Sequence, residues 1–228
     1  MQNKLIKYLS GFVTPARLEL FKEVLTKRTS YISVVLEDIY QPQNASAVLR
    51  TCDCFGIQNV HVIENRNSFR VSSQVSLGAS KWLTVHKYNK AADNTPEAVR
   101  SLKQNGYRIV AATPGKKCGL LKDFDISKGK TAVVFGSELP GISEYLLNNA
   151  DEFLKIPMVG FTESFNISVS AAIILYDISQ KLRKQPGLNW QLTEEEKKAV
   201  KLQWLRNSIK KSNLLEQRYL KEQERSKD

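Results

Sequence analysis

The chain has 228 residues, of which 42% are hydrophobic, enough to bury a core, so a wholly disordered chain is excluded. Lysine and arginine number 34 against 23 aspartates and glutamates, which gives a formal net charge of +11 at pH 7. This charge favours a polyanionic partner without identifying one.

The positive charge is concentrated at the two ends of the chain. Residues 1–30 contain six basic and two acidic residues, and residues 181–228 contain thirteen basic and seven acidic residues. Residues 31–180, in contrast, contain fifteen basic and fourteen acidic residues. We therefore expect a nearly neutral body with basic extensions that bind the partner. The sequence has no apolar run of the roughly 20 residues that cross a bilayer, and its first residues are too charged for a secretory signal. These patterns predict a cytoplasmic protein that does not bind membranes.

The first predicted element is an amphipathic helix over residues 17–28, within a basic helical N-terminal extension over residues 1–30. Short runs rich in β-branched residues then alternate with helix-like stretches. This alternation predicts an α/β domain over residues 31–185, with a mostly parallel sheet covered by helices on both faces. The expected strands are 32–36, 60–63, 83–86, 108–112, 131–135 and 153–156, and the expected helices between them are 44–55, 96–105 and 141–149.

The clearest helix signature follows Ser164. Apolar residues recur there with helical spacing up to Leu182, and Ser164 or Asn166 can cap the first turn. The pair Pro186-Gly187 ends the helix and marks a boundary. Thr193 with Glu196 then forms a capping-box signature, so residues 186–228 are predicted to be a basic helical C-terminal extension.

Metal, disulfide and common nucleotide-binding motifs are not indicated. Three cysteines without CxxC spacing and two histidines make a structural zinc site or a disulfide framework improbable, and we expect no metal. His61 and His86 alternate within apolar strands and are interpreted as ordinary sheet residues. The sequence also lacks the GxGxxG cradle and the GxSxG and HExxH motifs.

Three stretches contain more polar residues than a core or a turn requires. The first is the helix after the first strand, with Asn44 at its start and Arg50 inside it. Taken alone, this stretch favours a structural interpretation, in which Asn44 is an N-cap and Arg50 is a surface cation paired with an acid.

The second stretch, Phe135-Gly-Ser-Glu-Leu-Pro-Gly-Ile142, follows the strongest strand, where ligands of open α/β sheets commonly bind. Gly136 allows close backbone approach to a ligand. The third stretch, Ile156-Pro-Met-Val-Gly160 followed by Ser164-Phe-Asn166, runs from a strand end into a helix N-terminus, whose amides can hold a polar or anionic group.

Together the three stretches resemble the SPOUT class of methyltransferases, and within it the TrmH group of tRNA (guanosine-2'-O-)-methyltransferases. The resemblance rests on Asn44-Ala-Ser-Ala-Val-Leu-Arg50-Thr-Cys-Asp, Phe135-Gly-Ser-Glu-Leu-Pro-Gly-Ile-Ser143 and Ile156-Pro-Met with Ser164-Phe-Asn-Ile-Ser-Val-Ser-Ala-Ala172. It covers approximately residues 17–184. It implies a homodimer whose α/β domain contains a C-terminal trefoil knot, an exception to the rule that chains are unknotted.

The resemblance also implies S-adenosylmethionine as the cofactor and tRNA as the substrate, with a D-loop guanosine as the target and the C-terminal extension as the RNA-binding element. No metal is needed for this chemistry. The residues carried over for cofactor binding are Thr113, Gly136, Ile156, Met158 and Phe165, and the functional polar residues are Asn44, Arg50, Glu138, Ser164 and Asn166.

Arg50 is the expected catalytic residue. Because a guanidinium has a pKa above about 12, it is a poor proton acceptor, so we expect Arg50 to grip a phosphate beside the target ribose and to stabilise developing oxyanion charge. Glu138 is expected to orient Asn44 or Arg50. Two alternatives stay open: a ribosomal RNA 2'-O-methyltransferase, and an RNA-binding protein with this fold but no turnover.

Overall fold

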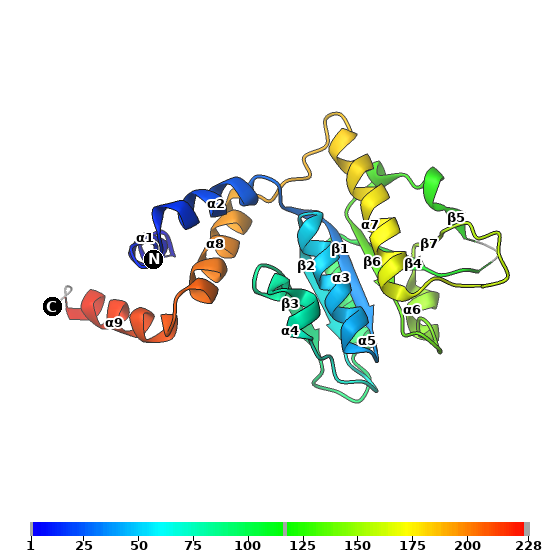
Figure 1. The fold of residues 1–228 in the computed structure, drawn as a ribbon, viewed down its shortest axis with the longest axis horizontal. Helices are drawn as coiled ribbons and strands as arrows, with labels where there is room; N and C mark the ends of the chain where they lie inside the picture. The colour runs from blue at the N-terminus through cyan, green and yellow to red at the C-terminus, as the bar shows by residue number, and fades with distance from the viewer. Residues whose placement is uncertain (1, 116–117, 226–228) are drawn as a thin grey trace. The chain divides into compact units, whose positions relative to one another are not determined.

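The computed structural model describes residues 2–115 and 118–225 (Figure 1). The chain divides into two compact units. Residues 29–190 form one unit, and residues 1–28 together with residues 191–228 form the other. The two ends of the chain therefore belong to the same unit.

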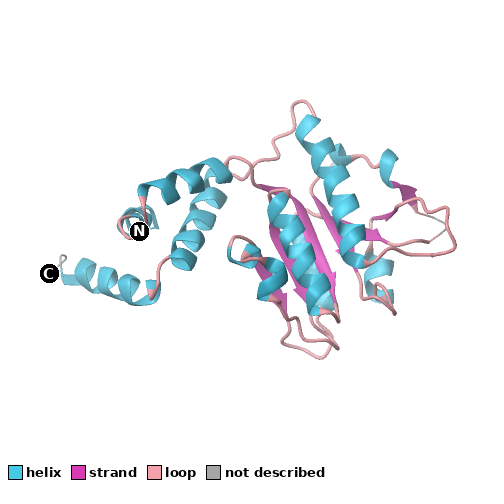
Figure 2. Cartoon of the chain, viewed as in Figure 1, coloured by secondary structure: helices cyan, strands magenta, loops and turns pink. Residues whose placement is uncertain are grey.

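The unit of residues 29–190 is built on a parallel sheet with the strand order β3-β2-β1-β6-β4-β7-β5 among the described residues. Figure 2 shows these strands side by side, with helices packed over them. Every strand pair is parallel, so all strands end at the same edge of the sheet. The strands are β1 (Thr29–Glu37), β2 (Ile57–Ile63), β3 (Thr84–Tyr88), β4 (Arg108–Ala112), β5 (Gly119–Leu120), β6 (Thr131–Phe135) and β7 (Glu152–Lys155).

The helices of this unit cover both faces of the sheet. They are α3 (Pro42–Cys54), α4 (Ser73–Ser76), α5 (Thr95–Gln104), α6 (Glu144–Asn149) and α7 (Ile167–Lys184), with 3-10 turns at Ala79–Lys81, Leu121–Asp123 and Ile126–Lys128. Alternate residues of a strand point to opposite faces. Val34 and Val133 accordingly join the core cluster that includes residues of α3 and α7, whereas Val35 and Val134 join the cluster that includes residues of α5 and α6.

Burial on both faces explains the composition of the central strands. All nine residues of β1 and all five of β6 are buried, which accounts for the apolar runs Val34-Val35-Leu36 in β1 and Ala132-Val133-Val134-Phe135 in β6. The predicted α/β class, the parallel sheet and the two covered faces are therefore confirmed. His61 and His86 are sheet residues as expected; they face each other on β2 and β3 and their rings stack with centroids 4.5 Å apart.

The second unit is helical among its described residues. It contains α1 (Gln2–Ser10), α2 (Pro15–Leu25), α8 (Glu194–Ser208) and α9 (Ser212–Arg225). Its core includes the fully buried Leu9 and Trp204, and the rings of Phe21 and Trp204 meet edge to face at 5.3 Å. The predicted capping box is present, because Thr193 and Glu196 bond to each other's backbone amides.

Candidate functional site

The candidate site lies where the order of strands along the sheet changes direction. From β1, the chain continues to β2 and β3 on one side, whereas β6 and β4 lie on the other. In open α/β sheets, ligands bind outside the carboxyl ends of the strands at such a point. β1 and β6 are parallel neighbours, with Leu36 beside Phe135, so the segments that follow them emerge together.

The segment after β6 is a tightly closed loop. Ser137 and Gly141 donate backbone hydrogen bonds to each other's carbonyl oxygens, both at 3.1 Å. A Cβ atom on Gly136 would lie 2.2 Å from the backbone carbon of Gly141, so only glycine fits there. The close approach that the sequence suggested at Gly136 is therefore an approach to the loop's own backbone, and it gives the loop the shape that carries Glu138.

Asn44 lies inside helix α3 and is not its N-cap. The helix begins at Pro42, a residue preorganised for the first helical position, and Gln41 precedes it. The expectation that Asn44 starts the helix is thus wrong by two residues. Its side chain is buried, and its amide nitrogen donates to Glu138 Oε1 at 2.6 Å and to Gln41 Oε1 at 3.2 Å.

Asn166 joins the third stretch to the same network. Its side-chain oxygen caps helix α7 by accepting from the amide of Ser168 at 2.8 Å, so Asn166 is the cap and Ser164 is not. Its side-chain nitrogen donates to Asn44 Oδ1 at 3.1 Å. Both ends of the Asn44 amide are therefore engaged, and one network connects three stretches that lie far apart in the sequence.

Arg50 and Ser164 do not take part in this network among the described residues. Arg50 lies on the exposed side of α3 with no hydrogen bond to Glu138, so Asn44 is the residue that Glu138 contacts. Ser164 is exposed and lies beside a different feature, a small hollow next to the network.

Four of the five residues expected to bind the cofactor share this hollow. Thr113 after β4, Ile156 and Met158 after β7, and Phe165 before α7 all line it, together with Ser164, and its volume is about 50 Å³. Gly136 does not line it. The walls of the hollow consist of apolar side chains and of the backbone at the ends of the neighbouring strands β4 and β7. Such walls suit a flat apolar ligand group that is held by backbone contacts.

The loop between the hollow and α7 has free backbone groups. Among the described residues, the backbone of residues 157–165 makes no hydrogen bond to another backbone group. Buried polar groups of the backbone are normally paired, so a segment of this kind needs solvent or a ligand as partner. Its amides and carbonyls can therefore supply the donors and acceptors that a polar ligand requires.

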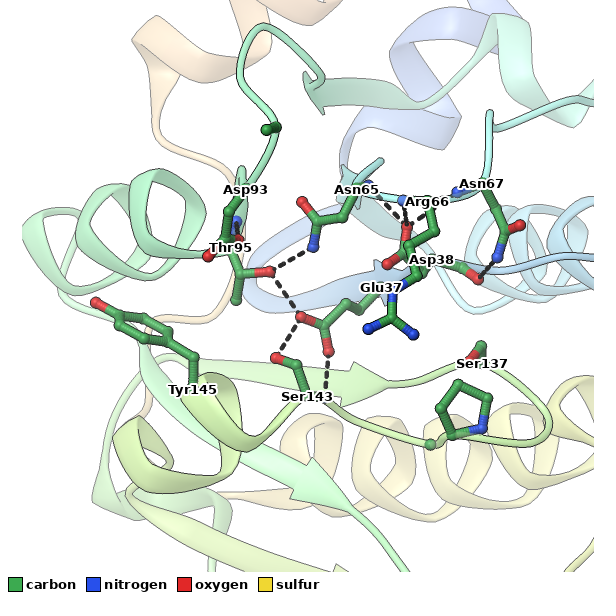
Figure 3. A pocket seen from close by; sticks show the side chains of 13 residues that line it. Glu37, Asp38, Asn65, Arg66, Asn67, Asp93, Thr95, Ser137, Ser143 and Tyr145 are labelled. Carbon is green, nitrogen blue, oxygen red and sulfur yellow. Dashed lines mark hydrogen bonds between the residues drawn. The ribbon is translucent and has the colours of Figure 1, made fainter.

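A second, larger pocket of about 330 Å³ lies at the same edge of the sheet and is polar (Figure 3). Glu37, the last residue of β1, is buried there and accepts from the Thr95 hydroxyl at 2.7 Å and from the Ser143 amide at 2.8 Å. Sequence reasoning missed this carboxylate. The available signal was the pair Glu37-Asp38 directly after a buried apolar strand.

Two kinds of feature are not found in the part of the chain that the structure describes. Residues 2–115 and 118–225 contain no cluster of three or more histidine, cysteine, aspartate or glutamate side chains that could hold a metal ion. The helices within these ranges are all too short or too polar to cross a membrane.

Known proteins resemble this chain over most of its length. Residues 31–176 match the model of the SpoU rRNA Methylase family. A tRNA (guanosine(18)-2'-O)-methyltransferase of Borreliella burgdorferi is 41% identical over 93% of this chain and 95% of its own length. A protein of the same name from Thermus thermophilus is 36% identical over 85% of this chain and 97% of its own length.

A solved structure agrees with these sequence matches. The crystal structure of the A. aeolicus TrmH/SpoU tRNA modifying enzyme matches with a TM-score of 0.74 and 28% identity, covering 86% of this chain and 98% of that one. The likeness therefore extends from the sequence to the arrangement of the elements.

Proposed function

The chain belongs to the SpoU rRNA Methylase family, and from this membership we propose that it methylates the ribose 2'-hydroxyl of guanosine 18 in tRNA. The name shared by the two relatives supports this substrate and this position. The observation that carries the proposal is the hydrogen-bonded network of Asn44, Glu138 and Asn166, which lies next to a hollow lined by residues of the third stretch.

The methyl donor of this reaction is S-adenosylmethionine, which supplies an electrophilic methyl group on a sulfonium. The residues present fit such a group. Ile156, Met158 and Phe165 offer apolar surface for the adenine, and the free backbone groups of residues 157–165 offer hydrogen bonds to its polar edges. The hollow of about 50 Å³ has room for only a part of the cofactor, so we infer that the loop of residues 157–165 adjusts around it.

The network fixes the positions of the Glu138 and Asn44 side chains. The carboxylate of Glu138 is exposed and keeps one oxygen on Asn44, and a carboxylate has further lone pairs that can accept from a hydroxyl. We infer that Glu138 and Asn44 orient the target ribose. Alignment of reacting atoms can contribute up to about 7–11 kcal/mol to a barrier reduction, which makes orientation a sufficient role for these side chains.

Arg50 keeps the role that the sequence suggested for it. Its side chain is exposed on the helix that carries Asn44, and among the described residues no acidic group pairs with it. A guanidinium of this kind can bind a phosphate with two parallel hydrogen bonds. We propose that Arg50 grips a phosphate of the tRNA and stabilises the charge that develops on the ribose oxygen.

The helical unit is proposed to hold the body of the tRNA. Residues 1–28 and 191–228 together contain 16 basic and 9 acidic residues. The basic extensions that the sequence predicts at residues 1–30 and 186–228 remain a proposal about function. In this proposal, both ends of the chain contribute cations to one RNA-binding unit. A cytoplasmic location, where tRNA is available, follows from this substrate.

We further infer that the protein acts as a knotted homodimer. Exposed apolar side chains support the dimer: Val159 and Phe161 are completely exposed before α7, and Val169 and Tyr176 are 43% and 57% exposed along it. A large exposed apolar patch typically marks a protein interface. Light scattering should give twice the chain mass of 25.9 kDa, and a value of one chain mass would refute the dimer.

Mass spectrometry of nuclease fragments, which keep the position of a modified nucleotide, tests the activity. Purified protein, S-adenosylmethionine and unmodified tRNA should yield 2'-O-methylguanosine at position 18, and ribosomal RNA in the same assay should not react. Methylation of ribosomal RNA alone would favour the ribosomal alternative. Tight tRNA binding without cofactor binding in calorimetry would favour an RNA-binding protein without turnover.

A further inference from the structure

A third cavity opens beside the candidate site and is lined by basic and aromatic side chains. Its volume is about 670 Å³. Arg66, Arg70 and Tyr40 line it, together with Gln41, Pro42, Gln43, Asn67 and Ser68. The cavity wall thus contains two cations and several hydrogen-bonding groups and no acidic side chain, and Arg66 lies at its border with the pocket of Glu37, which it also lines (Figure 3).

The side chains that line this cavity are available to a partner. Arg66 and Arg70 are exposed, and no ion pair with an acidic side chain is found for either of them in the described parts of the chain. Tyr40 is 72% exposed although it lies only three residues after Glu37, the buried end of β1. A large aromatic ring presented to solvent in a cavity that cations also line is typical of a surface on which a nucleic acid base stacks.

The segment that carries both arginines is anchored at each end. At its start, the Asp38 carboxylate accepts from the amides of Asn65 and Arg66 at 2.7 and 2.9 Å, as Figure 3 shows. At its end, the amide of Ser72 donates to the buried hydroxyl of Ser46 at 2.7 Å. The backbone that presents the guanidinium groups is therefore fixed on both sides of the cavity.

The anchor at Asp38 requires an unusual backbone conformation. Asp38 has a φ of 53°, in the left-handed region that non-glycine residues rarely adopt. This conformation turns the chain after β1 so that the carboxylate reaches the loop after β2, and Asn67 donates back to the Asp38 carbonyl at 2.9 Å. Strained residues of this kind concentrate at functional sites.

The cavity is continuous with the catalytic network. Gln41 lines the cavity and also accepts from the Asn44 amide at 3.2 Å, and Pro42 and Gln43 connect the two along the chain. The cavity therefore borders Asn44, whose amide contacts Glu138. Arginine pairs recognise phosphates, and an exposed tyrosine accepts a base, which together match single-stranded RNA better than any uncharged ligand.

We propose that Arg66, Arg70 and Tyr40 form a grip for the RNA strand next to the methylated nucleotide. This proposal rests on the proposed function and names a part of the substrate-binding surface within the α/β unit itself, in addition to the basic helical unit. Arg66 and Arg70 bind two backbone phosphates, and Tyr40 stacks on a neighbouring base.

The test compares the double variant Arg66→Ala/Arg70→Ala with wild type and with Arg100→Ala. Arg100 is an exposed arginine on α5, which packs against the opposite face of the sheet, so it is a matched control. The double variant should raise the KM for tRNA about tenfold or more, with kcat at saturating tRNA within about twofold. Arg100→Ala should leave both unchanged.

Salt dependence provides a second readout. Each phosphate contact with a single strand contributes about 0.7 to the slope of log K against log salt concentration. The double variant should therefore lose about 1.4 from the slope of tRNA binding, whereas Arg66→Lys/Arg70→Lys should keep it. Tyr40→Ala should weaken binding and Tyr40→Phe should not, because only the ring is needed for stacking.

The failure of this proposal is distinguishable from failure of the proposed function. If wild type does not methylate tRNA, the proposed function is wrong. If wild type is active and the double variant keeps both its KM and its salt slope, the grip is refuted. A fall in kcat with an unchanged KM would also refute it. Because these side chains are exposed, equal circular dichroism spectra should exclude misfolding in every variant.

Discussion

His61 should make the stability of the α/β unit fall between pH 7 and pH 5. The imidazole is 5% exposed and lies beside His86 and Tyr88 of the neighbouring strand β3, and its Nδ1 is 3.0 Å from the Tyr88 hydroxyl. Burial, and secondarily the charge of His86, lowers the pKa of His61 from 6.5 to about 3. The folded protein therefore keeps this imidazole neutral at pH values at which the unfolded chain protonates it.

The size of the effect follows from proton linkage. Well above pH 6.5 neither state binds the proton, so the full stability is present; as the pH falls through 6.5 toward 3, only the unfolded state gains it. Each pH unit in this window corresponds to roughly 1.4 kcal/mol. At pH 5, one and a half units below the unfolded value, the loss from His61 is about 2 kcal/mol.

Urea unfolding of wild type and His61→Phe at pH 8 and pH 5 measures this loss. The phenylalanine ring can keep the stacking on His86 but does not titrate, so the variant isolates the proton effect from other groups. Wild type should lose about 2 kcal/mol more than the variant between the two pH values. Equal losses in the two proteins would refute the reasoning, since they would mean that His61 has a similar pKa in both states.

Three further predictions concern the site. Asn166→Asp should keep the cap of α7, and hence thermal stability, but should lower kcat because it cannot donate to Asn44; methyl transfer at the wild-type rate would contradict this. Gly136→Ala should abolish methyl transfer, because its Cβ would lie 2.2 Å from the backbone of the closed loop that carries Glu138; a variant with wild-type activity would show that the loop can adjust. Arg50→Lys should lower kcat at saturating tRNA at least about tenfold through loss of bidentate binding, and nearly full turnover would refute the assigned role.

Local sequence patterns predicted most of the fold. The strands 108–112 and 131–135 have the predicted bounds, because β-branched runs between turn residues have few alternatives. β5 was missed because it has only two residues, Gly119 and Leu120, and is a strand only through its pairing with β7. The start of α3 was placed two residues late because Asn44 is a common cap, although Pro42 was the stronger signal.

The site was predictable as a set of residues but not as a set of contacts. Resemblance to a family indicated Asn44, Glu138 and Asn166, yet the hydrogen bonds between them join positions 94 and 122 residues apart. Such contacts depend on the order of the strands in the sheet, which the hydrophobic periodicity of the sequence does not predict. The packing of both chain ends into one unit depends likewise on tertiary contacts between apolar faces, such as that of Phe21 with Trp204.

The position of Asn166 couples the proposed binding of the methyl donor to the proposed binding of the RNA. Its neighbours Ser164 and Phe165 line the hollow that we propose for the cofactor, while its own nitrogen donates to Asn44, which we propose orients the ribose. If the cofactor binds in this hollow, Asn166 connects the two binding sites through adjacent residues of the chain. Thermodynamic reciprocity then requires that, by whatever factor the methyl donor alters the affinity for RNA, RNA alters the affinity for the donor by the same factor.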